Sequence, residues 1–268
     1  MSGRSHADRL EILGCVVDRV SLQGATAKLE KLIETAGIHQ AIVLPVNSLM
    51  YGRRDRRFLD VCNQASIVLP DGMPLLWASR LLGAPIPGRV AGSDLMWELS
   101  RVAEKREYSC FLLGSTPEVV SKLERVLLRR FPRLRLVGSL APPLSRLFPA
   151  EVNDDIIRRV NATRPDILWV GLGAPKQELW IHDNLKRLDT RLAIGVGAAF
   201  DICSGSVRRA SPLMQKAGLE WFHRFLLEPK RLFRRYFIQA APFLPLVLAQ
   251  RVRRLFSYRS AAVHGRVR

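Results

Sequence analysis

The stretch DILWVGLGAPKQELWIHDN, residues 166–184, decides the fold class of this chain. An apolar run, ILWV, is followed by Gly171 and Gly173, and a helical pattern begins after Pro175. Glycine lets the backbone turn with φ above zero, and proline suits the first turn of a helix. The stretch therefore predicts a buried strand, a tight turn and then a helix.

Similar apolar runs recur along the chain and alternate with helical patterns. The runs predicted as strands are ILGCVV (12–17), AIVLPVN (41–47), ASIVLP (65–70), SCFLLGS (109–115), LRLVGSL (134–140), DILWVGLG (166–173) and LAIGVGAAF (192–200). Between two of them, Val120, Leu123 and Leu127 recur at helical spacing. Strands that are apolar on both faces and separated by helices predict an α/β fold. We expect Rossmann-like parallel sheets in two half-domains around a cleft, with a C-terminal helical appendage.

The positive charge of the chain gathers near its C-terminus. The 268 residues carry a formal charge of +18, and from Arg224 to the end eleven Lys and Arg face one acid, Glu228. We therefore divide the chain into an α/β domain, residues 1–219, and a basic amphipathic appendage, residues 220–268. A basic segment of this kind indicates an anionic partner: nucleic acid, a lipid surface or a phosphorylated substrate.

The cysteines and the apolar runs bear on metal sites, disulfides, secretion and membrane insertion. Four scattered cysteines without a C-x-x-C pair argue against a zinc site and a disulfide framework, and fit a reducing compartment. The N-terminus, MSGRSHADRL, lacks the apolar core of a secretory signal. The apolar run 238–249 has twelve residues and two prolines, whereas a membrane span needs about 20 apolar residues. This run is expected to dip into a membrane surface at most.

Four polar or glycine-rich stretches follow predicted strands. They are LPVNS (44–48), LPDGMP (69–74), GLGAPKQE (171–178) and GVGAAFD (195–201). Ligands of parallel α/β sheets bind beyond the carboxyl ends of the strands, and a helix N-terminus offers N–H groups to an anion. We therefore assign Gly171, Gly173, Pro175 and Gln177 to substrate binding, together with Gly114 at another strand end. A strand–helix connection without a ligand would use the same glycines and proline. The stretch has neither the Walker spacing nor the G-x-G-x-x-G spacing of known phosphate-binding loops.

Single polar residues at these ends have two interpretations each. Asp71, directly after a strand, is placed for general-base work, or it forms an Asx-turn or a helix cap. Asn47 has the same ambiguity at the neighbouring strand end. Arg89 faces an anion or is a solvated charge. Asp94 is interpreted as the N-cap of the helix that follows it.

The appendage carries an arginine pattern beside aromatic residues. Arg224, Arg231 and Arg234 share one helical face if the helix continues past Pro229. Guanidinium groups bind phosphate oxygens well, so the pattern is compatible with a phosphate site. The alternative interpretation is a basic helix face that only contacts solvent. The apolar side chains on the segment are Trp221, Phe222, Phe225 and Phe233. An amphipathic helix of this composition is typical of helices that lie on an anionic membrane.

Several of these stretches together resemble the WecG/TagA/CpsF family of bacterial glycosyltransferases, from about residue 12 to residue 237. The stretches that carry the resemblance are PDGMPLLWASRLLGAPIPGRVAGSDL, FLLGSTPEVVSKLE, DILWVGLGAPKQELWI and GVGAAFDICSGSVRRASPLMQKAGLEWFHRFLLEPKRLFRRY. The resemblance implies an inverting, metal-independent transfer of a sugar from a UDP-sugar to a polyprenyl-diphosphate-linked acceptor. It also implies peripheral association with the cytoplasmic face of the membrane and a role in cell-surface or exopolysaccharide synthesis.

The resemblance assigns roles to particular residues. Asp71 matches the general base and Asn47 matches a polar residue that helps to hold the sugar. Arg89 and Gln177 match positions near the donor, with Gln177 as the hydrogen-bonding tip of the 171–178 turn. Asp201 contacts the nucleotide or caps a turn.

The appendage arginines Arg224, Arg231 and Arg234 match those that close over the diphosphate. They would stabilise the leaving UDP without a metal ion, so we expect no cofactor.

Two positions depart from the family pattern. The family usually has Thr two residues before Asn47, where this chain has Pro45, so a hydroxyl contact to the substrate is lost. The frequent Gly-Gly-x-Phe-Asp is Gly-Ala-Ala-Phe-Asp here, at residues 197–201, which reduces backbone freedom. The first departure bears on which sugar is transferred.

Two other functions are compatible with the residues alone. One is a nucleic-acid-binding protein that uses the basic C-terminal segment, although no nucleic-acid module is recognisable. The other is a nucleotide-sugar-binding protein that has lost catalytic activity, which the replacement of the usual Thr by Pro45 would indicate. A homo-oligomer that hides the apolar surface of the appendage is also compatible with the sequence.

Overall fold

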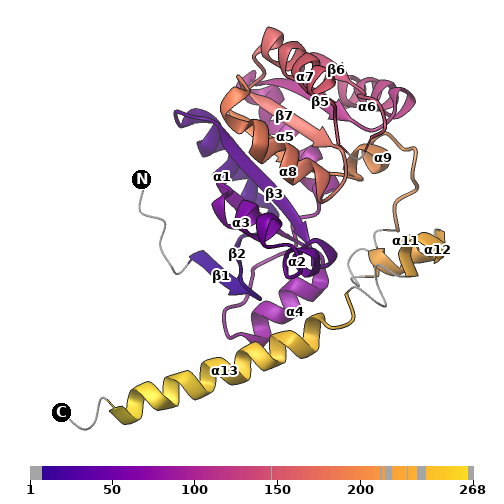
Figure 1. Cartoon of the computed structure of the whole chain (residues 1–268). Coiled ribbons are helices and arrows are strands. Elements are labelled where there is room, and N and C mark those ends of the chain that lie inside the picture. The colour runs from indigo at the N-terminus through magenta and orange to yellow at the C-terminus, as the bar shows by residue number, and fades with distance from the viewer. Residues whose placement is uncertain are drawn as a thin grey trace.

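The centre of the molecule is a six-stranded parallel sheet (Figure 1). The computed structural model describes residues 8–145, 147–211, 213–214, 219–227, 229–233 and 240–264. In spatial order the strands are β4 (Ile67–Asp71), β3 (His39–Pro45), β8 (Leu192–Gly195), β7 (Ile167–Gly171), β5 (Ser109–Gly114) and β6 (Arg135–Leu140). The predicted parallel α/β fold is confirmed. Pairing of β3 with β8 joins the two expected halves into one continuous sheet.

Helices cover both faces of this sheet. One face is covered by α1 (Leu22–Glu34), α5 (Gly92–Arg106), α6 (Pro117–Arg130) and α9 (Ala199–Cys203). The other face is covered by α2 (Val46–Gly52), α3 (Arg56–Gln64), α4 (Met73–Leu81), α7 (Ala150–Thr163) and α8 (Lys176–Asn184), which runs into the short helix η2 (Leu185–Arg187). Burial on both faces explains why the strands are nearly continuous apolar runs.

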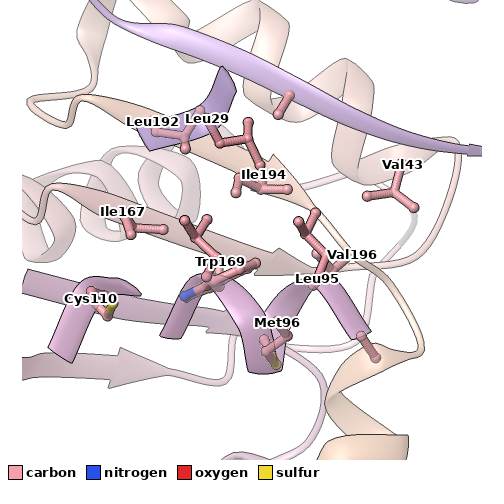
Figure 2. Close-up of a cluster of buried hydrophobic side chains, with 14 of the residues drawn as sticks. Leu29, Val43, Leu95, Met96, Cys110, Ile167, Trp169, Leu192, Ile194 and Val196 are labelled. Carbon is pink, nitrogen blue, oxygen red and sulfur yellow. The ribbon is translucent and has the colours of Figure 1, made fainter. Parts of the chain in front are cut away.

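The first face has the larger core. Figure 2 shows Trp169 of β7 and Ile194 of β8 in the same layer as Leu29 of α1 and Met96 of α5, and all four are fully buried. Helix α6 packs here through the predicted stripe of Val120, Leu123 and Leu127. Burying such side chains contributes about 1.5–3 kcal/mol each. The core therefore fixes the strands whose ends are considered below.

One predicted strand is wrong. The run at residues 12–17 is an antiparallel hairpin of β1 (Arg9–Ile12) and β2 (Cys15–Asp18), which turns at Leu13 and Gly14. Both turn residues have positive φ, 51° and 89°. The turn was not predicted because Leu13 and Cys15, on either side of Gly14, are apolar residues of the kind found in strands. Asp18 then accepts a hydrogen bond from the backbone N–H of Val68 in β4 (2.9 Å), so the hairpin is fastened to the sheet edge.

The C-terminal segment contains α11 (Glu220–Leu227), α12 (Pro229–Phe233) and α13 (Phe243–His264). Glu228, between α11 and α12, lies outside the described residues, so the condition that one helix continues past Pro229 stays untested. Phe243 and Val247 of α13 are buried against the second face (Figure 1). Gln250 and Arg254, further along α13, bond to Glu11 in the β1–β2 hairpin. Within the described part of the chain, no helix has the length and apolarity needed to span a bilayer.

Candidate active site

Two polar residues stand at neighbouring strand ends. Asp71 is the last residue of β4 and pairs in register with Pro45, the last residue of β3. Asn47 follows two residues later, in the first turn of α2, and both Asp71 and Asn47 are partly exposed. Parallel pairing thus brings a carboxylate and an amide to the same edge of the sheet, where ligands of such folds bind.

Helix α4, which follows Asp71, has its N-cap at the next residue. The N-cap of α4 is Gly72, with φ 99°, and no side-chain capping bond is made there. The helix-cap interpretation of Asp71 is therefore wrong. The backbone N–H of Val90 donates to the carbonyl of Pro70 (2.8 Å), so the segment that holds Arg89 lies against the same strand end.

The ends of β5 and β7 touch each other. Gly114 pairs with Gly171, has φ 131°, and an added Cβ would lie 2.5 Å from the carbonyl carbon and oxygen of Gly171. Gly171 in turn lies against the ring of Phe200, which an added Cβ would approach to 2.9 Å. Close packing inside the protein therefore explains why both positions are glycine. Their predicted contact with substrate stays a prediction.

The turn after β7 is closed by Gln177. The Gln177 N–H donates to the Gly173 carbonyl (3.0 Å), and the Gly173 N–H donates to Gln177 Oε1 (3.1 Å). Gly173 has φ 79° with open space around it, and the Ala174–Pro175 peptide bond is cis. The Gln177 side chain, assigned as the hydrogen-bonding tip of the turn, is buried, and its amide makes hydrogen bonds within the protein. A donor contact from Gln177 stays a prediction.

Asp201 lies on α9, just beyond the end of β8. It accepts a hydrogen bond from Ser115 Oγ (3.4 Å), which follows Gly114 at the end of β5. Its backbone carbonyl accepts from the N–H of Val207 (2.9 Å). Asp201 therefore lies at the same edge of the sheet as Asp71. It follows β8, two strands from β4, and its hydrogen bond connects it to the end of β5.

Arg89 is not a solvated charge, because it is paired with carboxylates in this structure, and its predicted place near the donor stays a prediction. Its Nη1 lies 2.7 Å from Glu220 Oε2, and its Nη2 lies 3.6 Å from Asp94 Oδ2. Its side chain is only 18% exposed. The N-cap of α5 is Ala91, so Asp94 is not the predicted cap. Asp94 instead accepts two hydrogen bonds from Arg209, at 2.6 and 2.8 Å.

Comparison with known proteins identifies the family of the chain. The model of the Glycosyl transferase WecG/TagA/CpsF family matches residues 10–257, nearly the whole chain. The chain belongs to the WecG/TagA/CpsF family. It is therefore a member of a family of glycosyltransferases, as the resemblance implied.

Curated relatives of this WecG/TagA/CpsF protein cover it almost from end to end. It is 27% identical over 254 residues to the N-acetylglucosaminyldiphosphoundecaprenol N-acetyl-beta-D-mannosaminyltransferase of Staphylococcus aureus (strain NCTC 8325 / PS 47). The match covers 94% of this chain and 96% of the relative. The protein of the same name from strain MRSA252 is 26% identical with the same coverage.

The appendage positions of the WecG/TagA/CpsF protein are described in part. Arg224 lies on α11 and Arg231 on α12, whereas Arg234 lies outside the described residues. Glu220, the first residue of α11, reaches Arg89, so α11 begins beside the strand end that carries Asp71. Among the described residues, no three His, Cys, Asp or Glu side chains are close enough to hold a metal ion.

Residues that sequence reasoning missed make many of the contacts at this edge. Arg209 and Glu220 connect segments far apart in the chain, and no spacing pattern marks them. Glu178, to which the sequence analysis gave no role, is fully buried next to Gln177. Its Oε1 accepts from Gln177 Nε2 (2.8 Å) and its carbonyl accepts from Gln40 Nε2 (2.9 Å), so it supports the turn from below.

The Glu178 carboxyl group is partly unsatisfied, since Oε2 has no hydrogen-bond partner among the residues that the structure describes. Burial raises the pKa of Glu178 to about 7, although hydrogen bonds from Gln177 and from its own backbone N–H act in the opposite direction. The folded chain therefore keeps the proton on Glu178 up to about pH 7, whereas the unfolded chain releases it near 4.5, the ordinary pKa of a glutamate side chain. Between these values the unfolded state binds fewer protons, so the free energy of unfolding falls as pH rises.

We expect Glu178→Gln to remove this pH dependence. A neutral amide carries no charge to desolvate, so the free energy of unfolding of the variant does not fall with pH. Relative to the wild type it therefore rises from about pH 4.5 to 7, by up to about 3 kcal/mol. Urea unfolding of both proteins at pH 5, 7 and 8 measures the difference. The exposed Glu151→Gln is the matched control and should follow the wild type. Parallel curves for Glu178→Gln and the wild type would show that Glu178 is ionised when folded.

Proposed function

We propose that this chain is an inverting glycosyltransferase that moves a hexose, N-acetylhexosamine or uronic acid from a UDP-sugar to a polyprenyl-diphosphate-linked acceptor. The observation that carries the proposal is the family match over residues 10–257, which spans every strand of the parallel sheet and most of α13. The Staphylococcus aureus relatives, by their names, transfer N-acetylmannosamine to a diphosphoundecaprenol-linked sugar. The proposed setting is polysaccharide synthesis at the cytoplasmic face of the membrane.

The geometry at the strand ends suits this chemistry. In an inverting transfer, the acceptor oxygen attacks the anomeric carbon opposite the leaving UDP and gives up its proton. Asp71 takes that proton as the general base, and Asn47, from the adjacent strand end, holds the sugar. A general base must be within reach of the incoming alcohol, and the partial exposure of Asp71 is compatible with this.

The departing diphosphate gains negative charge that needs positive or N–H partners. Arginines of α11 and α12 and the backbone of the Gly171–Gly173 turn are assigned this role. Gly173 has open space beside it, and its N–H, which donates to Gln177 Oε1 here, would have to exchange that partner for the diphosphate. No metal ion is required in this assignment.

Apolar side chains on the C-terminal helices support membrane association. Trp221 and Phe222 of α11 and Phe233 of α12 are exposed, as are Leu248 and Leu255 of α13. Helix α13 contains no Asp or Glu, whereas several arginines follow its first two turns. Apolar and basic side chains together favour an anionic lipid surface.

A donor panel tests the proposed function. The full chain is incubated with UDP-N-acetylmannosamine, UDP-N-acetylglucosamine, UDP-glucose and a UDP-uronic acid, each with a short-chain polyprenyl-diphosphate-linked N-acetylglucosamine. We expect one donor to give a lipid product heavier by one sugar residue, with the same rate in EDTA. The variant Pro45→Thr, which restores the hydroxyl usual in the family, should shift the preference toward UDP-N-acetylmannosamine.

Two results would contradict the proposal. Activity that is lost with EDTA and returns with magnesium or manganese would mean that a divalent cation, and not arginine, stabilises the leaving group. Absence of product with every donor, together with tight and salt-sensitive RNA or DNA binding in a filter assay, would favour the nucleic-acid-binding alternative.

A further inference from the structure

Four charged side chains form a closed network at the base of α11. Arg209 donates to both carboxylate oxygens of Asp94, at 2.6 and 2.8 Å, and its Nε donates to Glu220 Oε1 at 2.9 Å. The second oxygen of Glu220 accepts from Arg89 Nη1 at 2.7 Å. Glu220 therefore holds two arginines at once, one through each oxygen. We call these four residues the ion clasp.

The ion clasp joins three separate parts of the chain. Arg89 precedes α5 and Asp94 lies in its first turn, Arg209 follows α9, and Glu220 opens α11. The contacts cross 131 residues from Arg89 to Glu220 and 115 residues from Asp94 to Arg209. The ion clasp thus connects the helical appendage to the α/β domain.

The position and burial of the ion clasp distinguish it from ordinary surface pairs. The backbone N–H of Val90, next to Arg89, bonds the carbonyl of Pro70, next to Asp71. Side-chain exposure is 14% for Glu220, 18% for Arg89 and 20% for Arg209. Exposed ion pairs contribute little, whereas bidentate, partly buried networks hold their geometry. Two positive and two negative charges balance, so loss of Glu220 leaves two arginines against one carboxylate.

We propose that Glu220 is a positioning residue that anchors α11 beside Asp71 through the ion clasp. The proposal rests on the proposed function, in which arginines of α11 and α12 stabilise the departing diphosphate. Arg224 lies one helical turn after Glu220 on α11. An anchor at the first residue of the helix sets where that next turn lies. Arg209 bridges the anchor to α5, and Asp94 holds Arg209 in place.

The test combines hydrogen exchange with steady-state kinetics on the full chain. In Glu220→Gln, we expect the amides of residues 221–227 to exchange at least about ten-fold faster, because the helix detaches more often. The kcat at saturating donor should fall by about ten-fold, while KM for the donor changes little, because arginine positioning acts mainly on charge that develops in the transition state. The melting temperature of the chain should stay near that of the wild type.

A double-mutant cycle shows whether the ion clasp acts as a unit. Arg209→Gln alone should give similar changes, and the pair Arg209→Gln with Glu220→Gln should add little to either. Glu220→Asp keeps the charge and should recover most of the exchange protection and of kcat. The matched control is Glu98→Gln, which breaks an ion pair with Arg101 on the same helix α5 but outside the ion clasp. It should leave α11 exchange and kcat unchanged.

Each contrary outcome has a distinct meaning. Unchanged exchange of α11 in Glu220→Gln overturns the anchoring role. Faster exchange with unchanged kcat overturns the positioning role. A Glu220→Asp variant as impaired as Glu220→Gln shows that charge is not what holds the helix. If the wild type transfers no sugar from any donor, the proposed function fails, while the exchange data still decide the anchoring.

Discussion

Replacing Asp71 with Asn should lower the rate of glycosyl transfer by about 10³-fold or more, because a positioned general base contributes about 10²–10⁴-fold to such a step. The amide has the shape of the carboxylate but cannot accept the proton of the acceptor hydroxyl. Asp71 makes its parallel-strand contact with Pro45 through the backbone, so the fold should survive the change. UDP-sugar binding should also survive, since the arginines and the glycine turn are untouched. Turnover and calorimetric UDP binding measure the two effects separately.

The control for this change is Asp60→Asn on α3, an Asp whose surface pair with Arg56 is remote from the strand ends. It should keep wild-type turnover. If Asp71→Asn melts early and also loses UDP, Asp71 has a structural role at the strand end, and its assignment as the general base is wrong. If Asp71→Asn keeps a large share of the turnover, the general base is another residue and the assigned mechanism is wrong.

The sheet could be predicted from the sequence because its strands are buried on both faces. The runs predicted as strands overlap the strands of the sheet, except the first, where Leu13 and Gly14 make a turn inside an apolar run. The turn depends on backbone angles that a leucine rarely adopts, so composition gave no signal for it. Strand order also could not be predicted, because it depends on long-range pairing such as that of β3 with β8.

The strand-end residues were predictable for a related reason. Parallel strands bring their carboxyl ends to one edge, so Asn47, Asp71 and Asp201 had to lie on the same side of the sheet. Contacts between side chains distant in sequence were not predictable. Arg209 and Glu220 follow no periodic pattern, and only the folded chain shows that they bridge the appendage to α5. Burial of Gln177 likewise depends on how the ends of β7 and β8 meet.

Replacing Gly114 with Ala should lower the free energy of unfolding by about 3–5 kcal/mol, since overpacking and forbidden backbone angles act together there. The added methyl group would lie 2.5 Å from the backbone of Gly171, which cannot rotate away as a side chain could. The φ of 131° adds strain for any residue with a Cβ. The ends of β5 and β7 must then separate, which also disturbs the turn assigned to the donor. Urea unfolding measures the loss.

Gly83→Ala is the matched control, because Gly83 also has a positive φ of 76° but has nothing within 4 Å of an added Cβ. It should lose only about 1 kcal/mol, the usual effect of backbone strain alone. The difference between the two variants isolates the contact between the two strand ends. A Gly114→Ala variant that is as stable as Gly83→Ala but binds UDP weakly would show that Gly114 serves ligand approach and not packing. That result would return Gly114 to the substrate-binding set assigned from the sequence.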